Sequence, residues 1–464
     1  MKKTLILALA LALVGGVAYA NFCARDYVPA ATLLVPYAVV DLDSTGVPNP
    51  SGYTTLLAVT NVSSAKQLIH VVVWDAQSDH VVDFDEVLSG YDVWTINFRD
   101  LLTGAFNSFD TSSTAGFFTG TISTKPVVPY GPTTNDSYVT PLPEPFDTDA
   151  ATPSSSGCNF PYGPLTSFGP AIVTALQAAI ITLPQYTTCQ VASVANPPWL
   201  ANLTDNPVFF YVTVDVVTAC NQNFPDEDGY WTGGFPSTQN TLIGDIIYLN
   251  QTANFSESVP AVAIEADTTW EGNIGFYSRY SDAALVDDFH EPLGTAFAFR
   301  YFDSGGITSN LMLWKTSLDI TLNADDDPVF DACRPYIYFA WDENENTKAR
   351  GAGGPSGFLT AEPNVIPFET QKVPLDVLNW NGLLANNGWM LLVFDPSIPF
   401  HGPFTSANAL QAWAGVQYYF GTYSTALEAA TLGNVWCFAQ DVLPPAGTLN
   451  YYDGALEHRF APTP

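Results

Sequence analysis

The pattern of apolar and polar positions along the chain predicts β-strands far more often than helices. The block of residues 54–102 holds four short runs rich in Val, Ile, Thr and aromatic residues, and Ser, Asp, Gln and Gly separate them. The last run alternates with a period of two, so its large apolar side chains share one face, whereas the second run is apolar on both sides. Such runs are typical of an antiparallel sandwich. The runs lie at residues 54–61, 67–74, 80–84 and 92–98.

Further strand patterns flank this block, at residues 31–40 before it and at residues 208–217, 242–249 and 261–265 after it. Between them, Ser, Thr, Pro and Gly dominate residues 103–206, which predicts a long insertion. The insertion contains one helical signal. Pro170 stands at a first-turn position, and three apolar residues then recur at intervals of four along one face. These residues are Ile172, Leu176 and Ile180.

The strand pattern of the first half returns in the second half. Six pairs of segments match in the same order, and the clearest match pairs Trp74-Asp75 with Trp341-Asp342. This predicts two diverged copies of one unit. A short helix is expected in the second copy at residues 406–413. The other matches pair TTLLAVTNV with SNLMLWKTS, DVWTINFRDLL with VPLDVLNW, VTVD with LLVFD, GDIIY with GVQYY and AIEA with ALEA.

We therefore expect a mainly β protein with two tandem antiparallel β-sandwich domains, immunoglobulin-like or jelly-roll-like, and short helices. The first domain is expected at residues 21–285, with the insertion at about 103–206, and the second at residues 286–464. The acidic segment DDFHE, residues 287–291, holds potential metal ligands. Two adjacent ligands do not make a site, so we interpret this segment as an interdomain linker.

The N-terminus predicts an exported protein. Lys2 and Lys3 precede an apolar run that ends in a small-residue cleavage signal at Ala20, as in a secretory signal peptide. We expect a secreted or periplasmic mature chain with no membrane span. All six cysteines follow the cleavage point, which predicts up to three disulfides of open connectivity. They are Cys23, Cys158, Cys189, Cys220, Cys333 and Cys437.

The charge of the chain excludes polyanionic partners. Only 14 basic residues stand against 46 acidic ones; without Lys2 and Lys3 the mature chain has 12 against 46, a net charge of −34. Such a surface repels nucleic acid and anionic lipid. Protein or glycan partners at the cell surface remain as expected partners, and the sequence leaves the oligomeric state open.

Two segments are candidates for binding. The loop after the run 208–217 is acidic, aromatic and rich in Gly. A loop that covers a sheet edge is the main interpretation, and the alternative is a binding surface on which Asp226, Asp228, Tyr230 and Trp231 combine cation and sugar contacts. Trp270 is a further loop aromatic.

The turn after the run 31–40 resembles the start of a calcium loop. Asp41, Asp43 and Thr45 take the first, third and fifth ligand positions, but Gly52 stands where a bidentate Glu is needed. A simple turn is the main interpretation, and a Ca²⁺ site is the alternative. No other cofactor is expected.

Candidate catalytic groups are few. His70 lies in a strand that is apolar on both sides, so we expect a buried histidine there. Asp83 and Asp85 would share a strand face, as a glycosidase pair requires, but carboxylates are so abundant that this pairing carries little weight. No nucleophile elbow, zinc-protease or phosphate-loop motif is present in the sequence. We therefore expect no enzymatic activity.

The runs ATLLVPY, TTLLAVTN, SGYDVWTINFRDLL, YVTVDVVTAC and GDIIYLNQTANFSE, together with AVAIEAD and the Trp-Asp hairpin, resemble a group of uncharacterised exported bacterial proteins of comparable length. The resemblance implies export and a shared fold, and it supplies no catalytic residues. The sequence thus favours a secreted structural or cell-surface interaction protein without catalytic activity. A carbohydrate-binding protein that uses loop aromatics is the alternative, and a glycan-active hydrolase is a third.

Overall fold

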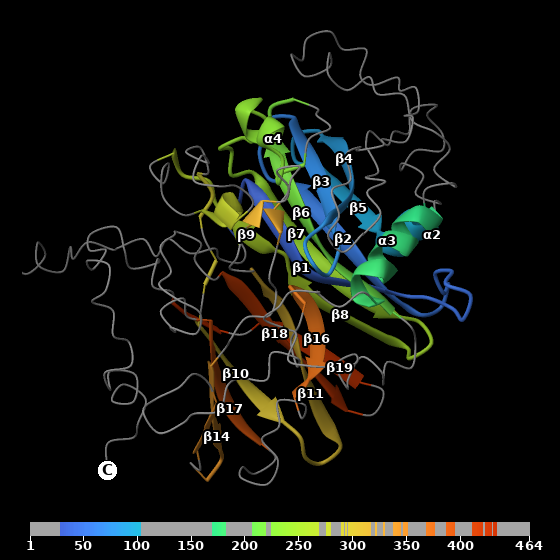
Figure 1. Cartoon of the computed structure of the whole chain (residues 1–464), viewed down its shortest axis with the longest axis vertical. Helices are drawn as coiled ribbons and strands as arrows, with labels where there is room; N and C mark the ends of the chain where they lie inside the picture. The colour runs from blue at the N-terminus through green and yellow to red at the C-terminus, as the bar shows by residue number, and fades with distance from the viewer. Residues whose placement is uncertain are drawn as a thin grey trace, which may run out of the picture.

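The computed structural model consists mainly of antiparallel β-sheets, arranged as two units of two sheets each (Figure 1). None of the described helices is long and apolar enough to cross a membrane. The structure describes residues 28–103, 169–181, 207–219, 224–268, 275–279, 289–291, 293–294, 296–316, 321–322, 328–329, 337–344, 347–350, 368–375, 387–394, 411–420, 423–428 and 430–433.

The first unit contains two sheets, which we call 1A and 1B. Their inner faces pack on each other through aromatic contacts, such as that of Phe84 with Trp94, whose ring centroids are 5.9 Å apart. Sheet 1A has the strand order β4 (His80–Leu88), β3 (Gln67–Trp74), β6 (Pro207–Val217), β1 (Thr32–Asp41) and β9 (Val262–Ile264). Sheet 1B has the order β5 (Val93–Asn97), β2 (Tyr53–Asn61), β7 (Leu242–Asn250) and β8 (Phe255–Pro260).

Burial along the strands follows the apolar pattern of the sequence. Strand β3 is buried at every position, as its two apolar sides predict, because sheet 1A is covered on both faces. Strand β5 instead alternates between exposed Val93 and Thr95 and buried Trp94 and Ile96. Strand β8 was not predicted, because FSESVP has three consecutive polar residues, Ser256, Glu257 and Ser258, and lacks a run of apolar ones.

Three helices and one 3-10 helix accompany the first unit: α2 (Phe98–Thr103), α3 (Gly169–Ile181), α4 (Asp228–Thr232) and η4 (Phe276–Arg279). Helix α3 confirms the predicted helical signal. Pro170 lies in its first turn, and Ile172, Leu176 and Ile180 are all buried on one face. The remaining residues of the predicted insertion lie outside the described residues.

The second unit also contains two sheets, 2A and 2B. Sheet 2A has the order β15 (Thr347–Arg350), β14 (Ile337–Asp342), β17 (Asn387–Val393), β10 (Ala296–Phe302) and β20 (Ala430–Gly433). Sheet 2B has the order β16 (Thr370–Pro374), β11 (Ile307–Lys315), β18 (Ala412–Phe420) and β19 (Tyr423–Glu428). A separate two-stranded ribbon joins β12 (Thr321–Leu322) and β13 (Pro328–Val329).

The two units have the same strand order. When the ribbon is left out, β10, β11 and β14–β20 occupy the places of β1–β9, sheet for sheet and neighbour for neighbour. Five of the six matched sequence segments lie on strands that correspond in this way. The sixth does not, because AIEA begins on β9 whereas ALEA begins on β19, which holds the place of β8.

Within the matched strands the residue alignment can slip by one position. Gly244 and Gly415 are paired in the sequence match, but they face opposite sides of their sheets. A Cβ on Gly244 would meet Leu33, on the inner face of sheet 1B. A Cβ on Gly415 would meet Trp413, on the side of sheet 2B that faces the first unit. A slip of one residue reverses the face of every side chain.

The predicted helix at residues 406–413 is wrong at its end, since Trp413 belongs to β18, and residues 406–410 lie outside the described structure.

The side of sheet 1A that faces away from sheet 1B, its outer face, is covered by the second unit. The Tyr211 ring on β6 meets Trp314 on β11 at a centroid distance of 5.9 Å, and Phe209 meets Phe368 at 5.4 Å. The connecting segment is packed as well. His290 is buried beside Ala266, and the Glu291 amide donates to the Glu265 carbonyl at 2.9 Å.

A partly buried lysine lies at the margin of this junction. The ammonium group of Lys372 lies 4.9 Å from the ring centroid of Tyr53 and 5.8 Å from those of Tyr37 and Tyr419. It also donates to the Gln417 side-chain oxygen at 3.2 Å, and the Gln417 amide donates to the Tyr53 hydroxyl at 2.9 Å. Since Tyr37 and Tyr53 belong to the first unit, this cation joins the two units.

Replacing this lysine should therefore loosen the junction. Lys372→Ala is expected to lower the free energy of unfolding by about 1–2 kcal/mol, because the aromatic rings of the two units lose the cation that lies between them. Urea denaturation followed by tryptophan fluorescence measures the loss. Lys66→Ala, at an exposed lysine between β2 and β3, is the matched control and should stay within about 0.5 kcal/mol of the parent. Equal stabilities of the two variants would contradict the role of Lys372.

Candidate functional site

Three residues that the sequence singles out, His70, Asp83 and Asp85, lie together on the outer face of sheet 1A. His70 on β3 lies directly opposite Asp85 on β4 and Asp215 on β6, and Asp215 lies opposite Thr32 on β1. Four polar residues from four strands thus form one row across the sheet. The row exists because the strands pair in this register, which joins residues far apart in the sequence.

His70 is the cationic centre of this row. Its Nδ1–H donates to Asp85 Oδ1 at 2.8 Å, and its Nε2 lies 3.9 Å from Asp83 Oδ2, beyond hydrogen-bond distance. Burial lowers the pKa of His70, but Asp85, through its charge and hydrogen bond, and the charges of Asp83 and Asp215 outweigh burial and raise the pKa to about 9. His70 is therefore a buried imidazolium at neutral pH.

Asp215 ties the helices above the sheet to this row. Its Oδ1 accepts hydrogen bonds from the Thr32 hydroxyl at 2.6 Å and the Tyr277 hydroxyl at 2.7 Å, and its Oδ2 accepts one from the Tyr230 hydroxyl at 2.6 Å. Burial, followed by the charge of Asp215, raises the pKa of Tyr230 well above its usual range. Tyr230 on α4 and Tyr277 on η4 thus hold both short helices on the sheet.

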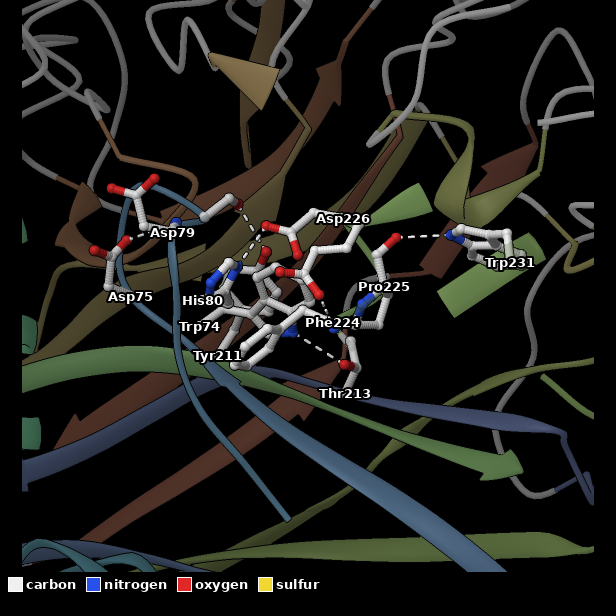
Figure 2. Close-up of polar contacts among 12 residues, drawn as sticks. Trp74, Asp75, Asp79, His80, Tyr211, Thr213, Phe224, Pro225, Asp226 and Trp231 are labelled. Atoms are coloured by element: carbon white, nitrogen blue, oxygen red, sulfur yellow. Dashed lines mark hydrogen bonds and ion pairs between the residues drawn. The ribbon is translucent and has the colours of Figure 1, made fainter. Parts of the chain in front are cut away.

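A second histidine pair lies at the start of β4 (Figure 2). The Nδ1–H of His80 donates to Asp226 Oδ2 at 2.7 Å, and the His80 ring stacks on Phe224 with centroids 3.7 Å apart. Trp74 lies close by, stacked on Tyr211 at 5.8 Å with an angle of 4° between the rings. This pair fixes the start of β4 to the loop that precedes α4.

The hairpin between β3 and β4 contacts the second unit through a further set of polar side chains. The Tyr211 hydroxyl donates to Ser78 Oγ at 2.7 Å, and Ser78 in turn contacts the Glu369 carboxylate. Burial, followed by the charges of Asp79 and Glu369, raises the pKa of Asp75 well above its usual range. The Glu369 amide donates to the carbonyl of Ala76 at 2.9 Å, which completes the docking of the hairpin.

Tyr230 and Trp231, the two candidate aromatics of the loop, lie on α4. Both are buried, and the Trp231 indole donates to the Pro225 carbonyl at 2.8 Å. Asp226 pairs with His80, as described above, and Asp228 begins α4 with a side chain outside the described structure. The loop therefore packs over sheet 1A. Trp270 lies outside the described residues.

In the predicted calcium turn, the carboxylate oxygens of Asp41 and Asp43 accept hydrogen bonds from nearby residues of the same chain. Asp43 Oδ1 accepts from the amide and hydroxyl of Thr45 at 2.8 and 2.6 Å, and Asp41 Oδ2 accepts from the Tyr53 amide at 2.6 Å. These bonds are those of a self-contained turn. Among the described residues, no three His, Cys, Asp or Glu side chains come together in a way that could hold a metal ion. All six cysteines lie outside that part of the chain.

Asp83 and Asp85 share one strand face, as expected, since both approach the His70 ring. A histidine between carboxylates can carry out acid–base catalysis where a substrate reaches it. Here the three side chains are buried under α4 and η4. A surface hollow of about 260 Å³ exists elsewhere, in the second unit, lined by Tyr301, Phe302, Asp303, Thr308, Ser309, Asn310, Pro374 and Leu375.

Sequence reasoning missed Asp215, Thr32 and Tyr277. Nothing local marks them, because they meet only through the pairing of β1, β3 and β6 and the position of η4. No family model, curated protein or solved structure matches this chain. The resemblance to exported bacterial proteins stays a prediction.

The raised pKa of His70 makes stability dependent on pH. Its folded-state value of about 9 lies above the usual 6.5, so the native state binds the proton more tightly than the unfolded state. The resulting stabilisation is complete below about pH 6.5 and is lost as the pH rises through about 9, at up to about 1.4 kcal/mol per pH unit.

His70→Gln should remove this pH dependence and cost about 3–5 kcal/mol at pH 6, because it leaves buried carboxylates without their cation. Urea denaturation of parent and variant between pH 5.5 and 10 measures the effect. Groups remote from His70 titrate alike in both proteins, so the difference between the two curves reports His70 together with the carboxylates that it pairs with. Parallel curves would contradict the assignment of a charged His70.

Proposed function

We propose that this protein is an exported structural or cell-surface interaction protein without catalytic activity. The observation that carries the proposal is the burial of its chemically capable groups. His70, Asp83, Asp85 and Asp215 face one another beneath α4 and η4, and the same sheet face receives the second unit. Their chemistry is used to hold elements together.

The proposal includes two tandem antiparallel β-sandwich domains that are diverged copies of one unit, with the boundary near residue 285. The identical strand order of the two units supports it. The polar row distinguishes the copies. When Trp74 is aligned with Trp341, His70 corresponds to Ile337, and the residue opposite it, Asp215, corresponds to Val393. At these two positions the first copy has polar residues of the row and the second copy has apolar residues.

The carbohydrate-binding alternative loses two of its named contacts. Tyr230 and Trp231 are buried, so their ring faces do not offer the stacking surface that a sugar needs. The proposal therefore predicts that the purified mature chain binds no glycan on an array, hydrolyses no polysaccharide in a substrate panel, and melts at the same temperature with Ca²⁺ as with EDTA. Reproducible binding, hydrolysis or a Ca²⁺-dependent rise in melting temperature would each overturn the proposal.

A variant sharpens this assay. Trp231→Ala removes a buried indole and its hydrogen bond, so we expect a loss of about 3–5 kcal/mol in unfolding free energy and no change in the glycan array. An array signal that disappears in Trp231→Ala while the folded fraction is unchanged would support the sugar-binding alternative instead.

Export is a separate part of the proposal. We predict that the protein recovered from the periplasm or medium begins at Asn21, and that Ellman titration of the denatured, unreduced chain finds no free thiol, because an even number of cysteines can pair fully after export. Mass spectrometry of the mature N-terminus checks the first point. An uncleaved leader or six titratable thiols would contradict the predicted compartment.

A further inference from the structure

The described structure contains three occurrences of the motif Asn-x-Ser/Thr, which in an exported chain marks the acceptor asparagine of N-glycosylation. They begin at Asn61, Asn250 and Asn254. Two further occurrences, at Asn135 and Asn202, lie outside the described residues. A glycan is bulky and hydrophilic, so the folded chain accommodates it only where the asparagine side chain lies at the surface. Burial and hydrogen bonding therefore decide which of the three asparagines can carry one.

Asn61, at the end of β2, is closed to modification by its own hydrogen bonds. Its side-chain nitrogen donates to the carbonyls of Ala65 and Ser89 at 2.7 and 2.8 Å. Its side-chain oxygen accepts from the hydroxyl of Ser63 at 2.8 Å, so the hydroxyl of the motif is engaged as well. The residue is fully buried. A sugar on this nitrogen would remove one of the donor bonds and separate the turns that they join, so Asn61 has a structural role.

Asn250, at the end of β7, is occupied by the turn that follows it. Its side-chain oxygen accepts from the Ala253 amide at 2.9 Å. The hydroxyl of its motif, on Thr252, donates to the Ser51 carbonyl at 2.9 Å. Asn250 is also only partly exposed. Both polar groups of this motif are thus used to build the turn between β7 and β8, which makes Asn250 a poor acceptor.

Asn254 has none of these restraints. It is exposed at the last position of the same turn, with a φ of 51°, a left-handed conformation that asparagine adopts more readily than most residues. Its backbone amide donates to the Gln251 carbonyl at 3.2 Å, and its side chain makes no hydrogen bond with the described residues. Ser256, which carries the hydroxyl of the motif, is exposed on β8. Both groups that the motif requires are therefore accessible.

The middle residue of this motif anchors it to the fold. Phe255 is buried, and its ring centroid lies 5.5 Å from that of Tyr53 on β2 and 6.4 Å from that of Tyr419 in the second unit. Successive strand residues point to opposite sides, so burial of Phe255 leaves Ser256 on the outside. The motif is thus held at the surface of an ordered hairpin, with Asn254 at its tip.

The corresponding turn of the second unit has no acceptor motif. Strands β18 and β19 hold the places of β7 and β8, and only Gly421 and Thr422 separate them in the sequence. In the first unit, residues 251–254 separate the two strands. The acceptor therefore lies in a turn that differs between the two units, and the shared strand order does not require it.

We propose that Asn254 is an N-glycosylation site, and that it is the acceptor among the three motifs of the described structure. The proposal rests on the predicted export of the chain. Three observations lead to it: the motif itself, the exposure of Asn254 and Ser256, and the absence of a side-chain hydrogen bond at Asn254 within the described residues. The two other asparagines fail the second or the third of these criteria.

The modification is a glycosyl transfer. The side-chain nitrogen of Asn254 forms a bond to the anomeric carbon of an oligosaccharide that is carried on a lipid pyrophosphate. The bond between that carbon and the phosphate oxygen breaks, and the lipid pyrophosphate leaves with the bonding electrons. One proton of the amide passes to a base of the transferase. The transfer requires no oxidant or reductant, only the glycosyl donor and its enzyme.

Mass spectrometry of the chain recovered from the cells that naturally export it tests the proposal. Proteolysis and electron-transfer fragmentation assign each sugar to a single asparagine. We expect hexose or N-acetylhexosamine mass on Asn254 and none on Asn61 or Asn250. The same spectra identify the mature N-terminus, so export and glycosylation are measured on one sample.

Variants made in the same cells separate the acceptor from the turn. Asn254→Asp tolerates the same backbone conformation but lacks the amide nitrogen, and Ser256→Ala lacks the hydroxyl, so both should abolish the modification. Ser256→Thr restores a hydroxyl and should keep it. Ser258→Ala, at an exposed serine on the same side of β8, is the matched control and should be modified like the parent. All four changes are at exposed positions, and circular dichroism checks that the chains fold.

Three outcomes would overturn the site: an unmodified Asn254 on a chain that begins at Asn21, a sugar on Asn61 of the folded chain, or a Ser256→Ala chain that is modified like the parent. The first of these leaves export and the proposed structural role in place. An unmodified chain that retains its leader would overturn export and the site together. Polysaccharide hydrolysis by a chain that is modified at Asn254 would remove the structural role and leave the site in place.

Discussion

Sheet 1A is covered on both faces, and this places charged and hydroxyl groups where water cannot solvate them. An unpaired buried charge costs several kcal/mol, so these groups have to satisfy one another. His70 does so with Asp85, and Asp215 does so with three hydroxyl groups. Because two of those hydroxyls belong to α4 and η4, the pairing of charges also decides where these short helices lie.

The same constraint makes the two units depend on each other. Trp314, Phe368 and Lys372 of the second unit complete the cover of the first, and the connecting segment at His290 is itself buried. Removing the second unit would expose Tyr211 and Phe209. The two units therefore contribute to each other's stability.

The location of the apolar and charged groups also indicates where partners can act. Among the described residues, the groups that resemble catalytic or sugar-binding residues in the sequence, His70, Asp83, Asp85, Tyr230 and Trp231, lie beneath the surface. A partner of the described part of the chain therefore meets other side chains than these.

The sequence by itself determined most strands, helix α3 and the matching order of the two halves, because apolar periodicity is a local property that each strand needs in order to bury one face. It also placed Asp83 and Asp85 on one face and His70 in a buried strand. It did not reveal the partners of His70 or the burial of Tyr230 and Trp231. Those depend on which strands pair and on what covers the sheet, and Thr32 and Asp215 meet across 183 positions of the sequence. Only the tertiary structure decides such contacts, because strand register pairs residues that are far apart in the chain, and the local sequence of a strand does not specify its partner.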